Sequence, residues 1–213
     1  LQPAVPEAMV SIRPGSYQFV DLKVMPNFQA IAVGPGLGTA ETTATALKLL
    51  IQSTTRPLIL DADALNILAE NKTWLGFLPA HSILTPHPKE FERLAGSTAD
   101  SWERLELQRD FSIKNNVFVI LKGAHTCITT PAGDAYFNGT GNPGMATAGC
   151  GDALTGVLAG LMAQGYTPLE SALLGTWVHG LAGDLALEDT SYEGLITRDL
   201  IQKLGEAFRL TSP

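Results

Sequence analysis

The sequence NGTGNPGMATAGCGD, Asn138 to Asp152, is a glycine-rich loop that runs directly into a small and apolar segment, Asp152 to Gln164. Glycines allow backbone amides to close around an anion, and the N-terminus of a helix adds a partial positive charge. The stretch therefore predicts a phosphate cradle, formed by Gly149, Cys150 and Gly151, at the start of a buried helix.

Asp152 is the unexpected member of this stretch, because a carboxylate repels an anion unless it has a proton to take or a hydroxyl to hold. One interpretation is a general base beside the bound phosphate. The other is a helix-capping carboxylate after a flexible loop.

Upstream of the loop, strands are predicted to alternate with helices. Apolar runs at 28–33, 57–61, 82–85 and 117–121 predict strands, the last of them buried on both faces. Helices are predicted at 42–51, from about Ala64 with Asp63 as N-cap, at 90–94 after a turn at Pro86 to Pro88, and at 102–114. A hairpin is expected at 126–130 and 134–137, and two further helices at 169–187 and 198–209.

This alternation predicts an α/β layer fold with a mostly parallel sheet and an antiparallel edge hairpin, in which ligands bind at the carboxyl ends of the strands. No repeat, linker or charge block divides the chain, so one domain over residues 1–213 is expected. The first 27 residues hold two proline-broken pieces, around Val10 to Ile12 and Tyr17 to Val24, without a clear helix.

Composition narrows the function classes. Of 213 residues, 45% are hydrophobic and 16% charged, which is typical of a globular protein. With 14 Lys and Arg against 21 Asp and Glu, the formal charge is −7, and no basic cluster suggests nucleic-acid binding. Cys127 and Cys150 lack disulfide or zinc spacing, and no apolar run predicts a membrane span or signal peptide. A cytoplasmic protein is expected.

Several polar residues allow two interpretations each. Asp61 and Asp63 could be a metal pair, but carboxylates two residues apart in a turn more often provide a cap and a turn bond. Lys122 follows a buried strand and could be an ordinary solvated lysine. His87, between two prolines, is on its own more often a loop histidine than a ligand. The side chains of His81, His125 and His179 have no partner at ligand spacing, and no catalytic or metal role is expected for them.

Five segments in this order resemble the carbohydrate-kinase-like domain of ADP/ATP-dependent NAD(P)H-hydrate dehydratases, within the ribokinase-like superfamily. They are GPGLG (Gly34 to Gly38), LDADALN (Leu60 to Asn66), LTPHPKEFERL (Leu84 to Leu94), LKGAHT (Leu121 to Thr126) and NGTGNPGMATAGCGDALTGVLAG (Asn138 to Gly160). The resemblance implies a ribokinase-like three-layer α/β/α fold. It also implies that NADHX or NADPHX is dehydrated through phosphorylation of its ring hydroxyl and loss of phosphate, with ADP, as in bacterial relatives, or ATP as co-substrate.

Site residues also follow from the resemblance. Asp152 would deprotonate the ring hydroxyl as that hydroxyl attacks the terminal phosphoryl group. The hydrated substrate would be bound by Gly36, Gly38, His87 and Asp152. Glu90 would hold Mg2+ through water. The adenine nucleotide would be bound by Lys122, Gly123, Ala124, His125, Thr126, Asn142, Gly149, Cys150 and Gly151.

The sequence departs from the family at several positions. Ala148 and Cys150 stand where the family has Gly and Thr or Ser, and a thiol is a weaker donor than a hydroxyl. Lys89 replaces a Gly, and its cation could hold a substrate phosphate or face water. The family's opening strand, glycine turn and helix precede the point where this chain begins to match, so Leu1 is interpreted as an internal residue of a longer protein. A homo-oligomer and a fused or separate NAD(P)HX epimerase are the expected partners.

Two rival functions remain open. A ribokinase-like kinase for a vitamin-precursor alcohol would share Asp152 and the cradle, although such kinases usually carry Asn where His87 stands, which favours the dehydratase. A nucleotide-binding module without catalysis is the second rival, because of Ala148, Cys150 and the missing opening.

Overall fold

The computed structural model describes residues 5–10 and 28–211, and its centre is a six-stranded sheet whose strands lie side by side in chain order. The first four strands run parallel, and the last two are antiparallel additions at one edge. The strands are β1 (Ile31–Val33), β2 (Leu58–Leu60), β3 (Ile83–Leu84), β4 (Phe118–Leu121), β5 (Cys127–Thr129) and β6 (Ala135–Phe137).

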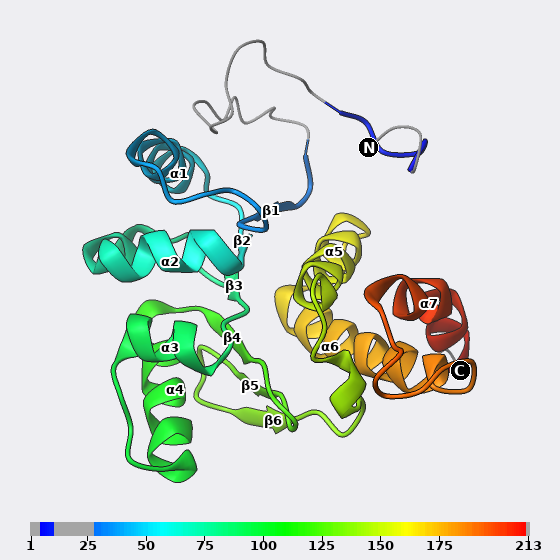
Figure 1. Cartoon of the computed structure of the whole chain (residues 1–213). Helices are drawn as coiled ribbons and strands as arrows, with labels where there is room; N and C mark the ends of the chain where they lie inside the picture. The colour runs from blue at the N-terminus through cyan, green and yellow to red at the C-terminus, as the bar shows by residue number, and fades with distance from the viewer. Residues whose placement is uncertain (1–4, 11–27, 212–213) are drawn as a thin grey trace.

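Helices cover both faces of this sheet (Figure 1). One layer contains α1 (Glu41–Ser53), α2 (Ala62–Glu70), the 3-10 turn η1 (Lys72–Phe77), α3 (Pro88–Ala95) and α4 (Ser101–Asn115). The opposite layer contains α5 (Cys150–Ala163) and α6 (Pro168–Ala186), with α7 (Thr197–Thr211) packed outside them; the 3-10 turn η2 (Pro143–Met145) lies in the loop before α5.

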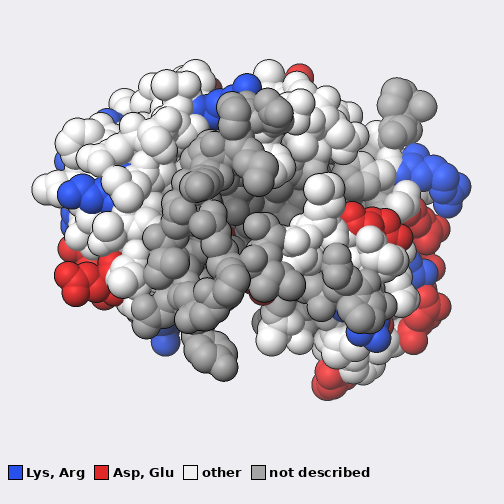
Figure 2. All heavy atoms as spheres, turned by 90° about the horizontal axis from the view of Figure 1, so that it is seen from above, with Lys and Arg blue, Asp and Glu red and all other residues white. Residues whose placement is uncertain are grey.

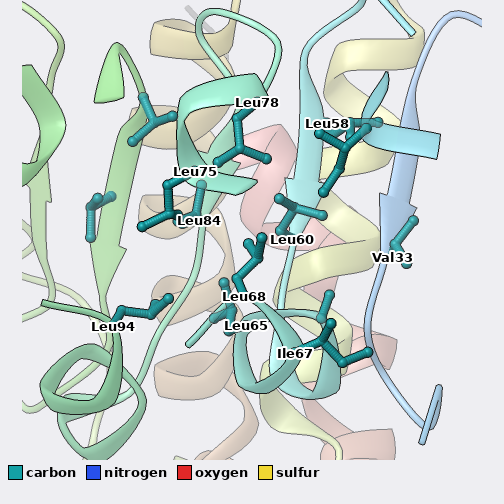
Figure 3. Packing of buried hydrophobic residues seen from close by; sticks show 14 of the residues in the cluster. Val33, Leu58, Leu60, Leu65, Ile67, Leu68, Leu75, Leu78, Leu84 and Leu94 are labelled. Atoms are coloured by element: carbon teal, nitrogen blue, oxygen red, sulfur yellow. The ribbon is translucent and has the colours of Figure 1, made fainter. Parts of the chain in front are cut away.

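The pleat of the strands divides the core between these layers. In β2, Leu58 and Leu60 pack with the apolar side chains of α1, α2 and α3, whereas Ile59 packs with those of α5. All three are completely buried. Figure 3 shows the first of these clusters, with leucines of β2, β3, α2 and α3 pointing toward one another. A strand apolar on both faces is what a parallel sheet between two helical layers requires.

A third cluster fixes α7 against the molecule. Val178 and Ala182 of α6 and Leu200 and Ala207 of α7 are buried together, and the side chain of Cys150 at the start of α5 joins them. The outer helix is thereby tied to the beginning of α5, where the cradle is expected.

The predicted fold class is confirmed, and every predicted strand and helix within residues 28–211 is present with shifted ends. One local prediction is wrong: the N-cap of α2 is Asp61, and Asp63 lies in the first turn.

The predicted pieces at 10–12 and 17–24 lie outside the described residues apart from Val10. None of the helices in the described ranges is long and apolar enough to cross a membrane.

Charge on the face at the β1 edge of the molecule is mixed. Figure 2 shows Lys and Arg on both its α1 and its α7 sides, with Asp and Glu among them.

Candidate functional site

The carboxyl ends of β1 to β4 meet at one edge of the sheet, and the segments that follow them contact one another. The amide of Asp61, after β2, donates to the carbonyl of Val33 at the end of β1 (3.1 Å). Gly34 has a φ of 138°, and a Cβ there would overlap the carbonyl oxygen of Asp61. Glycine is therefore required where the first two strand ends meet.

The carboxylate of Asp61 is the centre of this edge. It is 1% exposed, and it accepts from the Lys122 ammonium after β4 (Nζ to Oδ1, 2.8 Å) and from the Thr155 hydroxyl on α5 (Oγ1 to Oδ2, 2.8 Å). Buried charges are tolerated when they are paired in this way. The adjacent Ala62 has a φ of 47°, a strained conformation of the kind that gathers at functional sites. Asp61 occupies the N-cap position of α2, but its side chain makes no cap hydrogen bond, because both carboxylate oxygens accept from side chains of other elements.

Lys122 connects three of these segments. Its amide donates to the carbonyl of Pro86 after β3 (2.9 Å), and its side chain is only 24% exposed. A Cβ placed on Gly151 would lie 3.4 Å from Nζ. Lys122 is therefore held against the first turn of α5 and is not an ordinary solvated lysine.

The N-terminus of α5 has no side-chain cap. Its N-cap residue is Gly149, with a φ of 84°, and no side chain bonds the first-turn amides. Asp152 lies in this first turn and is exposed. An uncapped helix start beside a lysine ammonium is suited to an anion.

Cys150 contributes its backbone to this turn and its side chain to the core. The thiol is buried with α6 and α7, 3.5 Å from His179 Nε2, and burial raises its pKa to about 11. A protonated thiol turned into the core does not replace the hydroxyl expected at the cradle, and the amide of Cys150 donates to the carbonyl of Thr147 (3.3 Å).

The preceding glycine-rich loop is pinned to α6 by Asp184. One oxygen of Asp184 accepts from the amide of Gly141 (2.8 Å), and the other accepts from the Asn142 side chain (3.0 Å). The side-chain oxygen Oδ1 of Asn142 in turn accepts from the amide of Gly144 (3.0 Å). Asn142, a predicted nucleotide ligand, thus uses its side chain to shape the loop.

The other predicted nucleotide residues form a short turn between β4 and β5. Gly123, Ala124 and His125 are exposed, and the Thr126 hydroxyl donates to the carbonyl of Gly123 (3.2 Å). This exposed turn continues directly from Lys122, so the structure brings it to the same edge.

The predicted substrate glycines lie in the turn after β1. Gly36 and Gly38 have φ values of 63° and 74°, and nothing lies within 4 Å of the position of a Cβ on either of them. The amide of Gly38 donates to Asp63 Oδ2 (2.8 Å), which is the turn bond expected of one carboxylate of the pair. The turn is fixed from α2, and its glycine faces are open.

His87 caps α3 in a capping box with Glu90. Its Nδ1 accepts from the amides of Lys89 and Glu90, while its own amide donates to Glu90 Oε2 (2.8 Å). The side chain remains 45% exposed. The asparagine expected at this position in the rival kinases is also a good N-cap residue. Histidine in its place therefore keeps the N-cap of α3 and changes only the side chain that a ligand would contact.

The described residues do not form a preassembled metal-binding site. Within the described ranges, no three His, Cys, Asp or Glu side chains are grouped as metal ligands. Glu90 is 6% exposed, and both of its oxygens face His87, with Oε1 3.4 Å from Nε2. The carboxylate predicted to hold Mg2+ through water therefore also closes the capping box at the start of α3.

Thr155 and Asp184 were missed by sequence reasoning. Thr155 lies in an apolar helix, one turn after the glycine cradle, and a lone polar residue there could have been noticed. Asp184 has no motif around it, and its role depends on how α6 lies against the loop.

The fold is that of the ribokinase-like class of α/β proteins: a ribokinase-like superfamily protein from Enterococcus faecalis superposes with a TM-score of 0.72 at 30% identity, covering 86% of this chain and 64% of that one. A family model described as NAD(P)H-hydrate dehydratase matches residues 1–206, and the chain belongs to that family.

Three known proteins show how far the similarity extends. The chain is 40% identical over 190 residues to the bifunctional NAD(P)H-hydrate repair enzyme of Thermofilum pendens, covering 88% of this chain and 36% of that protein. It is 39% identical over 167 residues to the ADP-dependent (S)-NAD(P)H-hydrate dehydratase of Neisseria meningitidis, covering 76% and 56%. The crystal structure of the Bacillus subtilis ADP/ATP-dependent NAD(P)H-hydrate dehydratase with ATP/Mg2+ superposes with a TM-score of 0.76 at 29% identity, covering 91% and 68%. The chain thus spans about a third to a half of these curated relatives' length.

Proposed function

We propose that this chain is a single NAD(P)H-hydrate dehydratase domain, which uses ADP or ATP to convert NADHX and NADPHX back to NADH and NADPH. One observation supports the proposal most directly: the Lys122 ammonium and the uncapped first turn of α5 meet at Gly151, one residue before the exposed Asp152. A phosphate site and a carboxylate able to accept a proton therefore adjoin.

The nucleotide would place its transferable phosphoryl group against the turn formed by Gly149, Cys150 and Gly151, with Lys122 balancing its charge. The β4–β5 turn, Gly123 to Thr126, continues from Lys122 and would contact the rest of the nucleotide. In phosphoryl transfer the protein mainly positions reactants and neutralises charge, and this edge provides both.

The hydrated nicotinamide would lie against the open glycines Gly36 and Gly38 and the exposed edge of His87. Its ring hydroxyl loses a proton to Asp152 and forms a bond to the terminal phosphorus as the nucleotide leaves with one phosphate fewer. The ring carbon–oxygen bond then breaks, phosphate departs, and loss of a ring proton restores the double bond.

Mg2+ is proposed to bind together with the nucleotide. Mg2+ is commonly held by substrate phosphates and its own waters, with only one or two protein carboxylates. The neighbouring Bacillus subtilis enzyme was crystallised with ATP/Mg2+. We expect any magnesium in this chain to arrive with the nucleotide phosphates.

The proposed partners are a second copy of the chain and an NAD(P)HX epimerase. The Thermofilum pendens relative is named bifunctional, and this chain spans 36% of it, which supports pairing with a second activity of the same repair process. Both partners remain predictions, as does action in the cytoplasm.

The test is the return of NADH absorbance when the protein is incubated with NADHX, Mg2+ and either ADP or ATP. Asp152→Asn is expected to abolish turnover while nucleotide affinity stays within about twofold, because the amide keeps the size of the carboxylate but accepts no proton at neutral pH. Asp110→Asn, at an exposed position on α4, is the matched control and should retain wild-type rates.

Outcomes separate the rivals. NADH formation by the wild-type protein with loss in Asp152→Asn supports the dehydratase. A phosphorylated vitamin-precursor alcohol without NADH would indicate the kinase. Nucleotide binding without turnover of either substrate would indicate the non-catalytic module.

A further inference from the structure

Two carbonyl groups in the cradle accept hydrogen bonds from side chains of α6 and α7. The Thr197 hydroxyl, on the first residue of α7, donates to the carbonyl of Ala148 (2.7 Å). His179 Nε2, on α6, lies 2.9 Å from the carbonyl of Cys150. These carbonyls immediately precede the amides of Gly149 and Gly151.

The direction of those amides follows from peptide geometry. The described chain has no cis peptide bonds, and in a trans peptide the carbonyl and the next N–H point in opposite directions. A carbonyl of Ala148 held toward Thr197 turns the amide of Gly149 away from α7. The carbonyl of Cys150 belongs to the first turn of α5, so the helix and the contact with His179 together turn the amide of Gly151 away from α6.

The contact of Thr197 with the cradle is close. A Cβ on Gly149 would lie 3.4 Å from Thr197 Oγ1 and 3.7 Å from its Cβ and Cγ2, so this side chain packs directly on the glycine. Gly149 is in the left-handed region, where glycine has unusual freedom to turn. A neighbouring hydroxyl that holds one carbonyl is therefore a direct means of selecting one peptide orientation.

His179 is suited to the same task. It is 8% exposed, and burial lowers its pKa, so the neutral imidazole prevails at neutral pH. A neutral ring with its proton on Nε2 donates to the carbonyl of Cys150 without adding a charge to the core.

We infer that Thr197 and His179 are positioning residues that orient the amides of Gly149 and Gly151 toward a bound phosphate. This inference rests on the proposed nucleotide site and adds to it that α6 and α7 set its selectivity for phosphate. Neither residue is expected to touch substrate, and their effect passes through two peptide groups.

The main test compares Thr197→Val with Thr197→Ser. Valine keeps the shape and removes the donor, whereas serine keeps the donor. We expect Thr197→Val to weaken ADP binding about threefold to tenfold, as for loss of one neutral hydrogen bond, and Thr197→Ser to stay within about twofold of wild type. Binding is measured by displacement of a fluorescent ADP analogue at a temperature well below unfolding.

Adenosine distinguishes positioning from general damage, because it has no phosphate. Its affinity should be the same in Thr197→Val and wild type if only the cradle amides are disturbed. Thr211→Val is the matched control, since its hydroxyl bonds the carbonyl of Ala207 within α7 and lies away from the cradle. This control should bind both ligands as wild type does.

His179 gives a second, independent measurement. Gln can place a donor near the position of Nε2, whereas Met removes it, so His179→Met should weaken ADP binding more than His179→Gln. Unchanged ADP affinity in Thr197→Val, equal losses for ADP and adenosine, or failure of Ser to restore binding would overturn the inference. If the wild-type protein binds neither ADP nor ATP, the proposed function itself fails instead.

Discussion

The Lys122 ammonium lies 2.8 Å from Asp61 Oδ1 and so joins the carboxyl ends of β2 and β4 across the intervening β3. Asp61 is almost completely buried, and its second oxygen is satisfied by Thr155 of α5. The pair fixes a cation beside the cradle, with one carboxylate dedicated to holding it there.

Removing Asp61 should cost considerable stability. Asp61→Ala leaves a partly buried ammonium without its partner and Thr155 without an acceptor, and we expect a loss of about 2–4 kcal/mol in the free energy of unfolding. Urea denaturation followed by circular dichroism measures this change. Asp189→Ala is the control, because its ion pair with Lys203 involves a carboxylate that is 72% exposed, and little change is expected. Equal effects in the two variants would contradict the structural role of Asp61.

Lys122 can be tested separately from its structural role. Lys122→Gln should weaken ADP binding by about tenfold or more, because a charge-assisted contact to phosphate is lost, and should also destabilise the fold through the unpaired Asp61. The double variant Asp61→Asn/Lys122→Gln removes both charges. It should recover much of the stability while ADP affinity remains weak, as measured by calorimetric titration. Recovery of both properties together would show that Lys122 acts only on the fold.

Two substitutions of His87 should distinguish its role in helix capping from its role in substrate binding. His87→Asn retains an N-cap acceptor for α3, whereas His87→Ala loses it and should cost about 1 kcal/mol. Both variants lose the imidazole, so both should raise the KM for NADHX, by a similar factor of about three to ten if one ligand contact is removed. Thermal unfolding and initial rates at several NADHX concentrations check this. Wild-type kinetics in His87→Asn would show that the histidine serves only as a cap.

His179 should make stability depend on pH. Burial lowers its pKa in the folded protein below the value of about 6.5 in the unfolded chain, so the unfolded chain takes up a proton more readily. The contribution of neutral His179 is therefore complete above pH about 6.5 and is lost as the pH falls below it. When the pH is lowered from about 7.5 to about 5.5, the Tm of the wild-type protein should fall by more than the Tm of His179→Gln. Parallel losses in the two proteins would assign the pH dependence to other groups.

The sheet and its helices could be predicted because their signals are local. Apolar runs such as 117–121 are long enough to indicate strands buried on both faces, and the glycine and proline turns mark their ends. The N-cap of α2 was misplaced because Asp61 and Asp63 are chemically equivalent in the sequence. Their roles differ only because Lys122 and Thr155 reach the first and Gly38 reaches the second.

Site residues could be predicted where they belong to a short sequence segment that contains glycines and charged residues. They could not be predicted where a side chain contacts a residue far away in the sequence. The cradle, Asp152 and Lys122 belong to recognisable segments, and the structure brings Lys122 to Gly151. The Asp184 contact with Gly141 and the Thr197 contact with Ala148 cross 43 and 49 residues, and they exist only because α6 and α7 fold back over the loop. The Cys150 side chain was expected near phosphate. As the first residue of α5, however, Cys150 directs its side chain into the core formed with α6 and α7.

The strand order, identical to chain order, also has a consequence for folding. Each strand pairs with the one made just before it, but the parallel pairs, such as Ile31 with Leu58 and Ile83 with Phe118, each close a loop that contains at least one helix, so the sheet forms only as these helices do. The Thr155 to Asp61 bond, by contrast, closes a separation of 94 residues and must wait for α5. The proposed nucleotide site is therefore complete only when the whole sheet is, and a bound nucleotide would stabilise the finished molecule over every partly assembled one.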